Sequence, residues 1–301
     1  MVVAVYIGLC LIWGSTWLAI TYVIDDVPSC TAAAARFWVA TAVYLVVHVF
    51  RRIRFPADWR TRLGMVACGA PQIGISYSLV YWAEGHISSG LTAVLFATFP
   101  FFVAIFSAWL VEGEGWTRAK LIGLVCGMFG VSIVFMDQLE VESMTKPMAV
   151  AAVIAAAFSC GASVVWIKRH YMRYDTVALT ASQLLGGSIA LTAAAFVFES
   201  PLSAPWTPSA IFATLYLAVL GSAVAFFGYY WLLKRIEGTA VAAINFVTPV
   251  LAVFLGWLFR DETITPWLLI GGGLVFAGIR LVVRSQARRN GTERSGRVAA
   301  A

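Results

Sequence analysis

Long apolar runs separated by short polar segments make up almost the whole chain. Each run is close to the ~20 residues that a helix needs to cross a bilayer core. The segments between the runs carry charges or prolines, as RRIRFPADWR at 51–60 does. The pattern predicts an all-α integral membrane protein with ten transmembrane helices, near residues 3–24, 30–50, 61–83, 88–110, 118–136, 147–167, 177–198, 209–232, 238–259 and 265–283.

The composition supports this interpretation. Hydrophobic residues make up 61% of the chain and charged residues only 12%, about half the ~25% charge of soluble domains. A water-soluble fold is excluded, and the loops leave no room for a separate soluble domain. The first run has no basic leader and no small-residue cleavage site, so we interpret it as a retained helix rather than a signal peptide.

Basic residues are concentrated in alternate connecting segments. On the ten-helix topology, 17 of the 21 Lys and Arg residues fall on one side of the membrane, and only Lys146 and Arg260 fall in connections on the other side. Positive residues mark the cytoplasmic side, so we expect cytoplasmic N- and C-termini. The net charge of +6 therefore indicates orientation, and nucleic acid is not an expected partner.

The two halves of the chain repeat each other. An offset of 148 residues relates four pairs of matching positions: Gly90 and Gly238, Glu114 and Glu262, Gly123 and Gly271, and Gly130 and Gly278. Pro100 matches Pro249 at an offset of 149, and Arg36 corresponds to Gln183 at an offset of 147. Five spans per half place the second half upside down relative to the first. Such an inverted-topology repeat (5+5) is typical of secondary transporters, whose substrate site lies near the midplane between the repeats.

The sequence therefore divides into a first five-helix repeat at 1–137, a second at 147–285 and a basic cytoplasmic tail at 286–301. IWGSTWLAI at 12–20, ARF at 35–37 and the Pro, Glu and Gly pattern in both halves resemble the EamA-type transporters of the drug/metabolite transporter superfamily. The resemblance covers about residues 3–285. It implies an inner-membrane carrier with a central cavity lined by the first four spans of each half, and members that export amino acids and related metabolites.

Candidate ligands are uncharged, because no Asp, Glu or Lys lies near the middle of a span. Side-chain amides satisfy ammonium and carboxylate groups without burying a charge, although they also bond helix to helix. Aromatic faces hold planar, aliphatic or cationic solutes, although many rings only pack. The candidate substrate-binding residues are Trp13, Gln72, Ser76, Tyr77, Tyr81, Phe99, Ser159, Trp166, Tyr230 and Asn245.

Arg36 is the charged residue that lies well inside a predicted span of the first half. It is able to anchor a substrate carboxylate through its planar guanidinium, to extend outward to lipid headgroups, or to brace helices by bonding a carbonyl or Glu84. The sequence favours a structural or gating role.

Two further pairs are candidates for gating or structure. Pro100 and Pro249 fall mid-span at equivalent places, where proline bends a helix and two paired hinges are expected. Glu114 and Glu262 precede the following helix, and we expect each to cap its N-terminus. Glycines near 123–130 and 271–278 predict close helix packing, with dimer contact as one use.

The function predicted from these features is export of small metabolites, with amino acids or related amphipathic solutes as the favoured class, by alternating access. The alternative is a drug or toxic-compound exporter of the same fold. No catalytic motif, metal cluster or cofactor site is recognisable, so an enzyme is not expected. The five cysteines form no metal-binding pattern and are interpreted as packing residues. The expected partners are a small-molecule substrate and the lipid bilayer, with a monomer or a homodimer both open.

Overall fold

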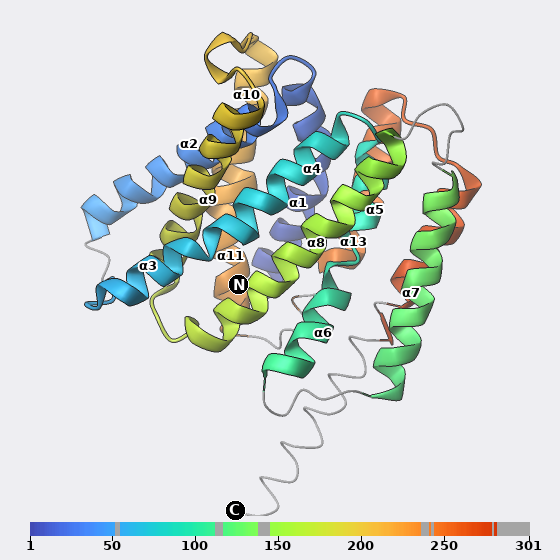
Figure 1. Ribbon diagram of the computed structural model, residues 1–301, viewed down its shortest axis with the longest axis horizontal. Coiled ribbons are helices and arrows are strands. Elements are labelled where there is room, and N and C mark those ends of the chain that lie inside the picture. Colours follow the sequence, from blue (N-terminus) through green and yellow to red (C-terminus); the bar gives the residue numbers. More distant parts are fainter. Residues whose placement is uncertain are drawn as a thin grey trace, which may run out of the picture.

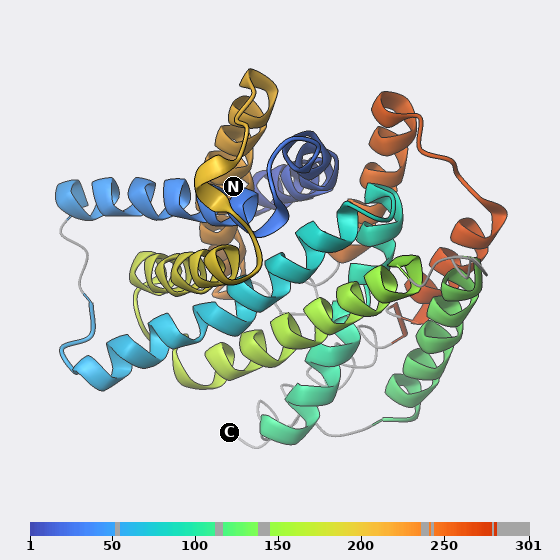
Figure 2. The same ribbon diagram turned by 45° about the horizontal axis from the view of Figure 1, so that its top comes forward.

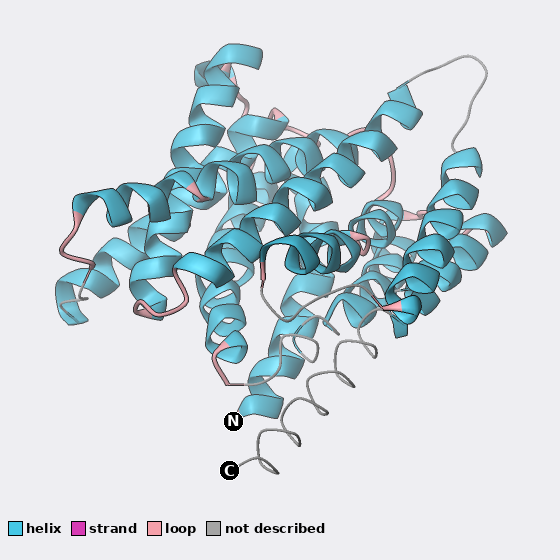
Figure 3. Ribbon diagram, turned by 60° about the horizontal axis from the view of Figure 1, so that its bottom comes forward, coloured by secondary structure: helices cyan, strands magenta, loops and turns pink. Residues whose placement is uncertain are grey.

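The computed structural model consists of helices, and no strand occurs among the residues it describes, which are 1–51, 55–111, 117–137, 145–235, 241, 244–278 and 280–281 (Figure 3). Seven helical segments are long and apolar enough to cross a membrane, and three shorter apolar helices accompany them in the described part of the chain. The all-helical prediction is confirmed, whereas the number of ten spans stays a prediction.

The helices follow the predicted runs in order (Figure 1). The first half holds α1 (Val2–Ile24), α2 (Ser29–Arg51), α3 (Trp59–Ala67), η1 (Ala70–Ile75), α4 (Ser76–Glu84), α5 (Ser89–Phe96), α6 (Phe99–Leu110) and α7 (Arg118–Asp137). The second half holds α8 (Thr145–His170), α9 (Thr176–Phe198), η2 (Pro201–Ser203), α10 (Pro208–Ala218), η3 (Val219–Val224), α11 (Ala225–Leu233), α13 (Ile244–Arg260) and a last helix, Pro266–Gly278.

Several helices begin where a polar side chain accepts the first free N–H groups. Asp58 accepts from the backbone N–H groups of Arg60 and Thr61 ahead of α3, and Asp175 does the same ahead of α9. The hydrogen bonds from Thr61, first its backbone N–H and then its hydroxyl, lower the pKa of Asp58. These caps explain why short polar segments suffice to separate long helices.

The two halves pack into each other rather than side by side. α2 packs on α9, α1 on α13, and α4 and α6 both pack on α8 (Figure 2). The largest buried cluster joins side chains from both halves, among them Phe37, Tyr81, Leu184 and Tyr230. The core therefore lies at the interface of the repeats.

Glycine permits the closest of these helix crossings. A Cβ atom at Gly69 would collide with the carbonyl oxygen of Gln183, and one at Gly186 would collide with that of Val66. Backbone therefore packs directly on backbone where α3 and η1 cross α9.

The glycines near 123–130 and 271–278 pack α7 against the helix Pro266–Gly278. A Cβ atom at Gly130 would meet the carbonyl oxygen of Gly271, and one at Gly278 would meet that of Gly123. The predicted close packing is thus formed within one chain. These faces are occupied by each other, so nothing in them favours the dimer contact that the sequence left open.

Two π-helical segments occupy equivalent places in the repeats. η1 at Ala70–Ile75 and η3 at Val219–Val224 interrupt otherwise continuous segments, Trp59–Glu84 and Pro208–Leu233, and their bounds differ by 149 residues, as the repeat does at Pro100 and Pro249. Wide helical turns of this kind often occur at functional sites. Both π-segments adjoin the cavity described below.

The prolines occupy different settings, contrary to the prediction of two equivalent mid-helix bends. Span four breaks at Ala97–Thr98, so Pro100 lies in the first turn of α6, where a missing N–H needs no partner. Pro249 lies inside α13. The bend at Pro100 is a helix break followed by a new start, and a hinge role for either residue stays a prediction.

Candidate functional site

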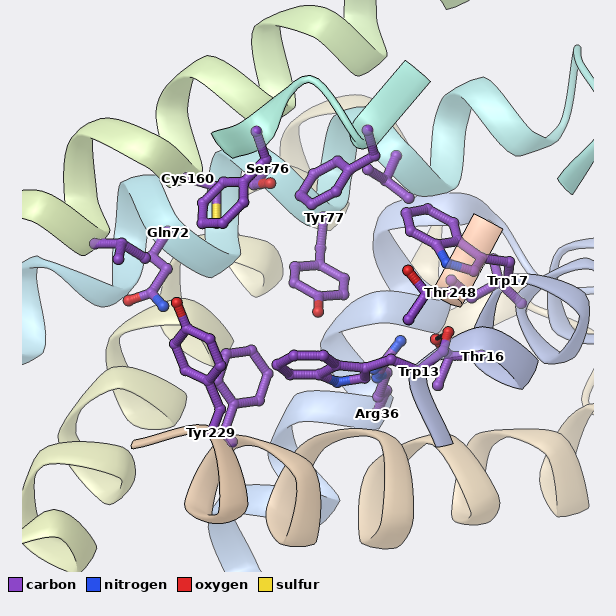
Figure 4. A pocket seen from close by; sticks show the side chains of 16 residues that line it. Trp13, Thr16, Trp17, Arg36, Gln72, Ser76, Tyr77, Cys160, Tyr229 and Thr248 are labelled. Atoms are coloured by element: carbon purple, nitrogen blue, oxygen red, sulfur yellow. Dashed lines mark hydrogen bonds between the residues drawn. The ribbon is translucent and has the colours of Figure 1, made fainter. Parts of the chain in front are cut away.

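A cavity of about 100 Å³ lies between the two repeats. Helices of both halves contribute to its wall, which is mostly aromatic and apolar (Figure 4). Such a wall with few polar groups is the usual form of a small-molecule site. The lining residues are Trp13, Thr16, Trp17, Ile20, Arg36, Gln72, Ser76, Tyr77, Val80, Phe96, Phe99, Cys160, Val164, Phe226, Tyr229 and Thr248.

Five of the ten predicted substrate-binding residues line this cavity: Trp13, Gln72, Ser76, Tyr77 and Phe99. Trp13 donates its indole N–H to the carbonyl oxygen of Gly221 at 3.3 Å, and the Ser76 hydroxyl donates to that of Ala156 at 3.1 Å. Both polar groups are therefore held in place by backbone of the opposite repeat, which fixes the rings and hydroxyls around the cavity.

Tyr81 and Tyr230 lie behind the cavity wall instead of in it. Both are fully buried. Tyr230 exchanges hydrogen bonds with the amide of Gln72 at 3.0 and 3.2 Å, and Tyr81 accepts one from Arg36 at 3.2 Å. They orient the polar lining residues Gln72 and Arg36 from behind the wall, and their predicted role in substrate binding stays a prediction.

Two other predicted ligands, Ser159 and Trp166, lie elsewhere. Ser159 donates to the carbonyl oxygen of Pro71 at 2.7 Å and is absent from the cavity wall. Trp166 is 45% exposed and stacks on His170, with ring centroids 4.2 Å apart. The side chain of Asn245 lies outside the described residues.

The cavity wall also contains residues that the sequence did not single out as ligands. Thr16, Cys160 and Thr248 supply small polar groups. The neighbouring π-segment η3 supplies the Gly221 carbonyl oxygen, which accepts hydrogen bonds from two lining residues, Trp13 and Arg36. Thr16 belongs to the IWGSTWLAI segment and Thr248 precedes Pro249, so the signals were present, but a single hydroxyl in an apolar run does not reveal which way it points.

Arg36 is 1% exposed and borders the cavity. Its Nε donates to the Ser222 hydroxyl at 2.8 Å and one terminal nitrogen donates to the Gly221 carbonyl at 3.2 Å. Of the alternatives left open for Arg36, the structure shows bonding to a carbonyl; a bond to Glu84 is absent, because neither carboxylate oxygen of Glu84 has a hydrogen-bond partner.

Glu262 caps a helix, but not the helix that follows it. Its carboxylate accepts from Ser89 through the backbone N–H at 2.9 Å and the hydroxyl at 2.7 Å, and from the Gly90 N–H at 3.1 Å. This is the N-terminus of α5, in the other repeat. The preceding Asp261 has a positive φ of 52°, which turns the chain back toward α5. Glu114 lies outside the described residues.

The same end of the bundle carries a second link between the repeats. Arg260 at the end of α13 forms a two-point ion pair with Asp25 at the end of α1, with both N–O distances at 2.8 Å. We call Glu262, Arg260 and Asp25 together the latch, because they tie α13 to α1 and α5. Glu84 is buried beside the latch, where cavities of about 410 and 330 Å³ open.

Within the described residues, no group of three potential metal-ligating side chains exists. The cavity wall itself contains no Asp or Glu. Its chemistry is limited to hydrogen bonding, aromatic contact and the single charge of Arg36, which suits reversible binding of a small solute.

Comparison with known proteins identifies the class. The chain matches the EamA-like transporter family at residues 1–136 and again at 147–284. It is 28% identical to the uncharacterized transporter YoaV of Bacillus subtilis, over 94% of this chain and 97% of that protein. It is 24% identical to the protein PagO of Salmonella typhimurium, over 94% and 95%. It is 26% identical to the uncharacterized inner membrane transporter YedA of Escherichia coli strain K12, over 90% and 87%.

A crystal structure of another protein superposes with a TM-score of 0.69 at 18% identity, covering 93% of this chain and 96% of that one, which shows the fold. The protein is thus a multi-pass membrane transporter that binds a small molecule within the bilayer. It belongs to the EamA-like family of the drug/metabolite transporter superfamily, and the family match repeats once in each half.

Proposed function

We propose that this transporter exports small amphipathic metabolites, with amino acids as the first class to test, by alternating access around the central cavity. The observation that carries the proposal is the cavity itself. Its volume of about 100 Å³ is below the ~300–1,000 Å³ of sites for drug-sized ligands, and it combines aromatic rings with one amide and one guanidinium. These groups match a solute with a short apolar part and a polar end.

The repeat architecture supports alternating access. Each half contributes one π-segment beside the cavity, and the latch joins the halves at one end of the bundle. The excess of basic residues on one side leads us to propose cytoplasmic termini in the inner membrane of a bacterium, with the latch on the outer side. Transport rather than catalysis is what the residues around the cavity support.

The alternative is a drug or toxic-compound exporter. Aromatic rings favour cations, but a cavity without a carboxylate does not compensate a cation's charge. The two proposals differ in the solute they predict, so one panel of substrates separates them.

The test is counterflow into proteoliposomes with purified protein and a panel of amino acids, nucleobases and cationic dyes, with and without a pH gradient. We expect uptake of amino acids that is independent of the gradient. Trp13→Ala and Tyr77→Ala are expected to reduce uptake, whereas Trp166→Ala, an exposed ring outside the cavity, serves as the matched control. Uptake of cationic dyes alone would replace the proposal by its alternative.

A further inference from the structure

The guanidinium of Arg36 is a buried charge without an ionic partner. Its three hydrogen bonds all go to neutral acceptors: Ser222, Tyr81 and the Gly221 carbonyl. Among the described residues, no carboxylate lies within ion-pair distance of it. Neither carboxylate oxygen of Glu84 has a hydrogen-bond partner, so no hydrogen bond joins Glu84 to Arg36. Burial of an unpaired charge is costly, so the fold must gain something else from it.

The other repeat shows that helix bracing does not need this charge. Gln183 occupies the position equivalent to Arg36, on α9, and is fully buried. Its amide donates to the carbonyl oxygen of Met65 at 2.7 Å, so it ties α9 to α3 as Arg36 ties α2 to η3. A neutral amide therefore performs the structural task in one half. The positive charge in the other half is additional.

That charge faces the cavity among neutral side chains. Arg36 borders the cavity together with Trp13, Thr16 and Gln72, and Figure 4 shows its side chain beside Trp13 and Thr16. An arginine has five N–H donors. With three engaged, one N–H on each terminal nitrogen is left, and two such donors match the two oxygens of a carboxylate.

The backbone is shaped to keep the guanidinium there. Gly221 accepts hydrogen bonds from both Arg36 and Trp13, and a Cβ atom at this position would lie 3.2 Å from a terminal nitrogen of Arg36 and 2.8 Å from the Thr16 methyl group. The rings of Tyr77 and Phe37 flank the guanidinium carbon at 5.0 and 5.1 Å. The group is held from several sides where it borders the cavity.

We propose that Arg36 binds the carboxylate of the transported solute, so that the substrates are small carboxylate-bearing amphiphiles. This inference rests on the proposed function, because it assigns the polar end of the solute to one residue. The apolar part of the solute then lies against Trp13, Tyr77 and Tyr229, and Gln72 is left for its second polar group.

The experiment compares acids with their amides. Binding of leucine and leucinamide, and of phenylalanine and phenylalaninamide, is measured by calorimetry on purified protein in nanodiscs. We expect the wild-type protein to prefer each acid by at least roughly 30-fold, the lower end of the loss typical when one partner of a buried charge pair is removed. Equal affinity for acid and amide in the wild-type protein would overturn the inference without any variant.

Arg36→Gln is the informative variant, because the other repeat already holds a glutamine in this position. It is expected to lose the preference for the acid, with acid affinity falling much more than amide affinity, and Arg36→Lys is expected to recover part of the preference. If Arg36→Gln is folded and weakens acid and amide equally, Arg36 is only a positioning residue and the inference is wrong. If it does not fold, the acid and amide comparison in wild type and in Arg36→Lys decides.

Failure of this inference is distinguishable from failure of the proposed function. Uptake of amino acids without a preference for the acid form removes the role of Arg36 and leaves amino acid export standing. A panel in which no amino acid is bound or transported removes both.

Discussion

Glu262→Gln is expected to loosen the latch. The carboxylate of Glu262 accepts three hydrogen bonds at the N-terminus of α5, two from Ser89 and one from Gly90. A glutamine keeps one oxygen for Ser89, but its NH₂ group then faces the Gly90 N–H, so one donor opposes another. Hydrogen bonds to a charged group contribute about 1.5–3 kcal/mol each. We therefore expect the substitution to destabilise the contact between Glu262 and the N-terminus of α5 by about 2 kcal/mol.

A loss of this size is enough to change the conformation of the transporter. About 1.4 kcal/mol corresponds to a tenfold change in an equilibrium constant, so a latch weakened by about 2 kcal/mol shifts the closed-to-open ratio at this end by roughly 30-fold. Spin labels at His86→Cys and Thr263→Cys, both exposed beside the latch, measure the opening by electron–electron distance in a background without the native cysteines. We expect a broader, longer distance distribution in Glu262→Gln.

Glu199→Gln is the matched control. Glu199 accepts from the Cys30 N–H at 2.7 Å, and from the Thr31 N–H and hydroxyl, both at 2.8 Å. It caps α2 in the way that Glu262 caps α5, without touching the latch. Both variants should lower the melting temperature, and only Glu262→Gln should change the label distances. Identical distance distributions in the two variants would refute a role for Glu262 in gating and leave it a helix cap.

Three further outcomes are expected. Gly221→Ala should abolish transport, because the added Cβ atom would press on Thr16 and Arg36. The control Gly273→Ala, where an added Cβ atom has no neighbour within 4 Å, should transport normally, and its free energy of unfolding should rise by up to ~1 kcal/mol from helix propensity. Normal transport by Gly221→Ala would contradict the cavity geometry. A small methanethiosulfonate should inhibit transport by modifying Cys160, the one native cysteine that borders the cavity. Bound substrate should slow this modification, and the Cys160→Ala variant should be insensitive to the reagent. Inhibition that persists in Cys160→Ala would show another site of action. Glu84→Met should raise the melting temperature at neutral pH, because it removes a buried carboxylate without hydrogen-bond partners. Leaving such a group unsatisfied destabilises the folded state by about 1–3 kcal/mol. A lower melting temperature would mean that the carboxylate has a stabilising role.

The fold was largely predictable because the bilayer imposes helix length and glycine marks close crossings. The offset of 148 that joins Gly130 to Gly278 by sequence also joins their helices in space. The family and the membrane transporter class followed from the same repeat and are confirmed by the comparisons.

The site was only partly predictable for a physical reason. A helix surrounded by lipid and apolar protein is hydrophobic on all sides. The distribution of polar residues along such a helix therefore does not predict which of its faces points toward the cavity. Tyr81 and Tyr230 were therefore expected in the cavity wall, although they lie one layer behind it, and Trp166 was expected inside although it lies outside. The π-segments also left no signal, since a wide turn depends on neighbouring helices as much as on local sequence.

The paired π-segments constrain how this chain tolerates change. A π-turn accommodates one residue more than an α-turn, and each added residue rotates all that follows by about 100° around the helix axis. Deleting one residue within η1 would thus rotate Gln72 and Tyr77 relative to each other, so that they would no longer both face the cavity. The apolar composition of the span would hardly change. Because η3 carries the same wide turn in the second half, one-residue deletions are expected to be more damaging in these two segments than almost any apolar substitution there. Insertion and deletion scanning would map the transport machinery more sharply than alanine scanning.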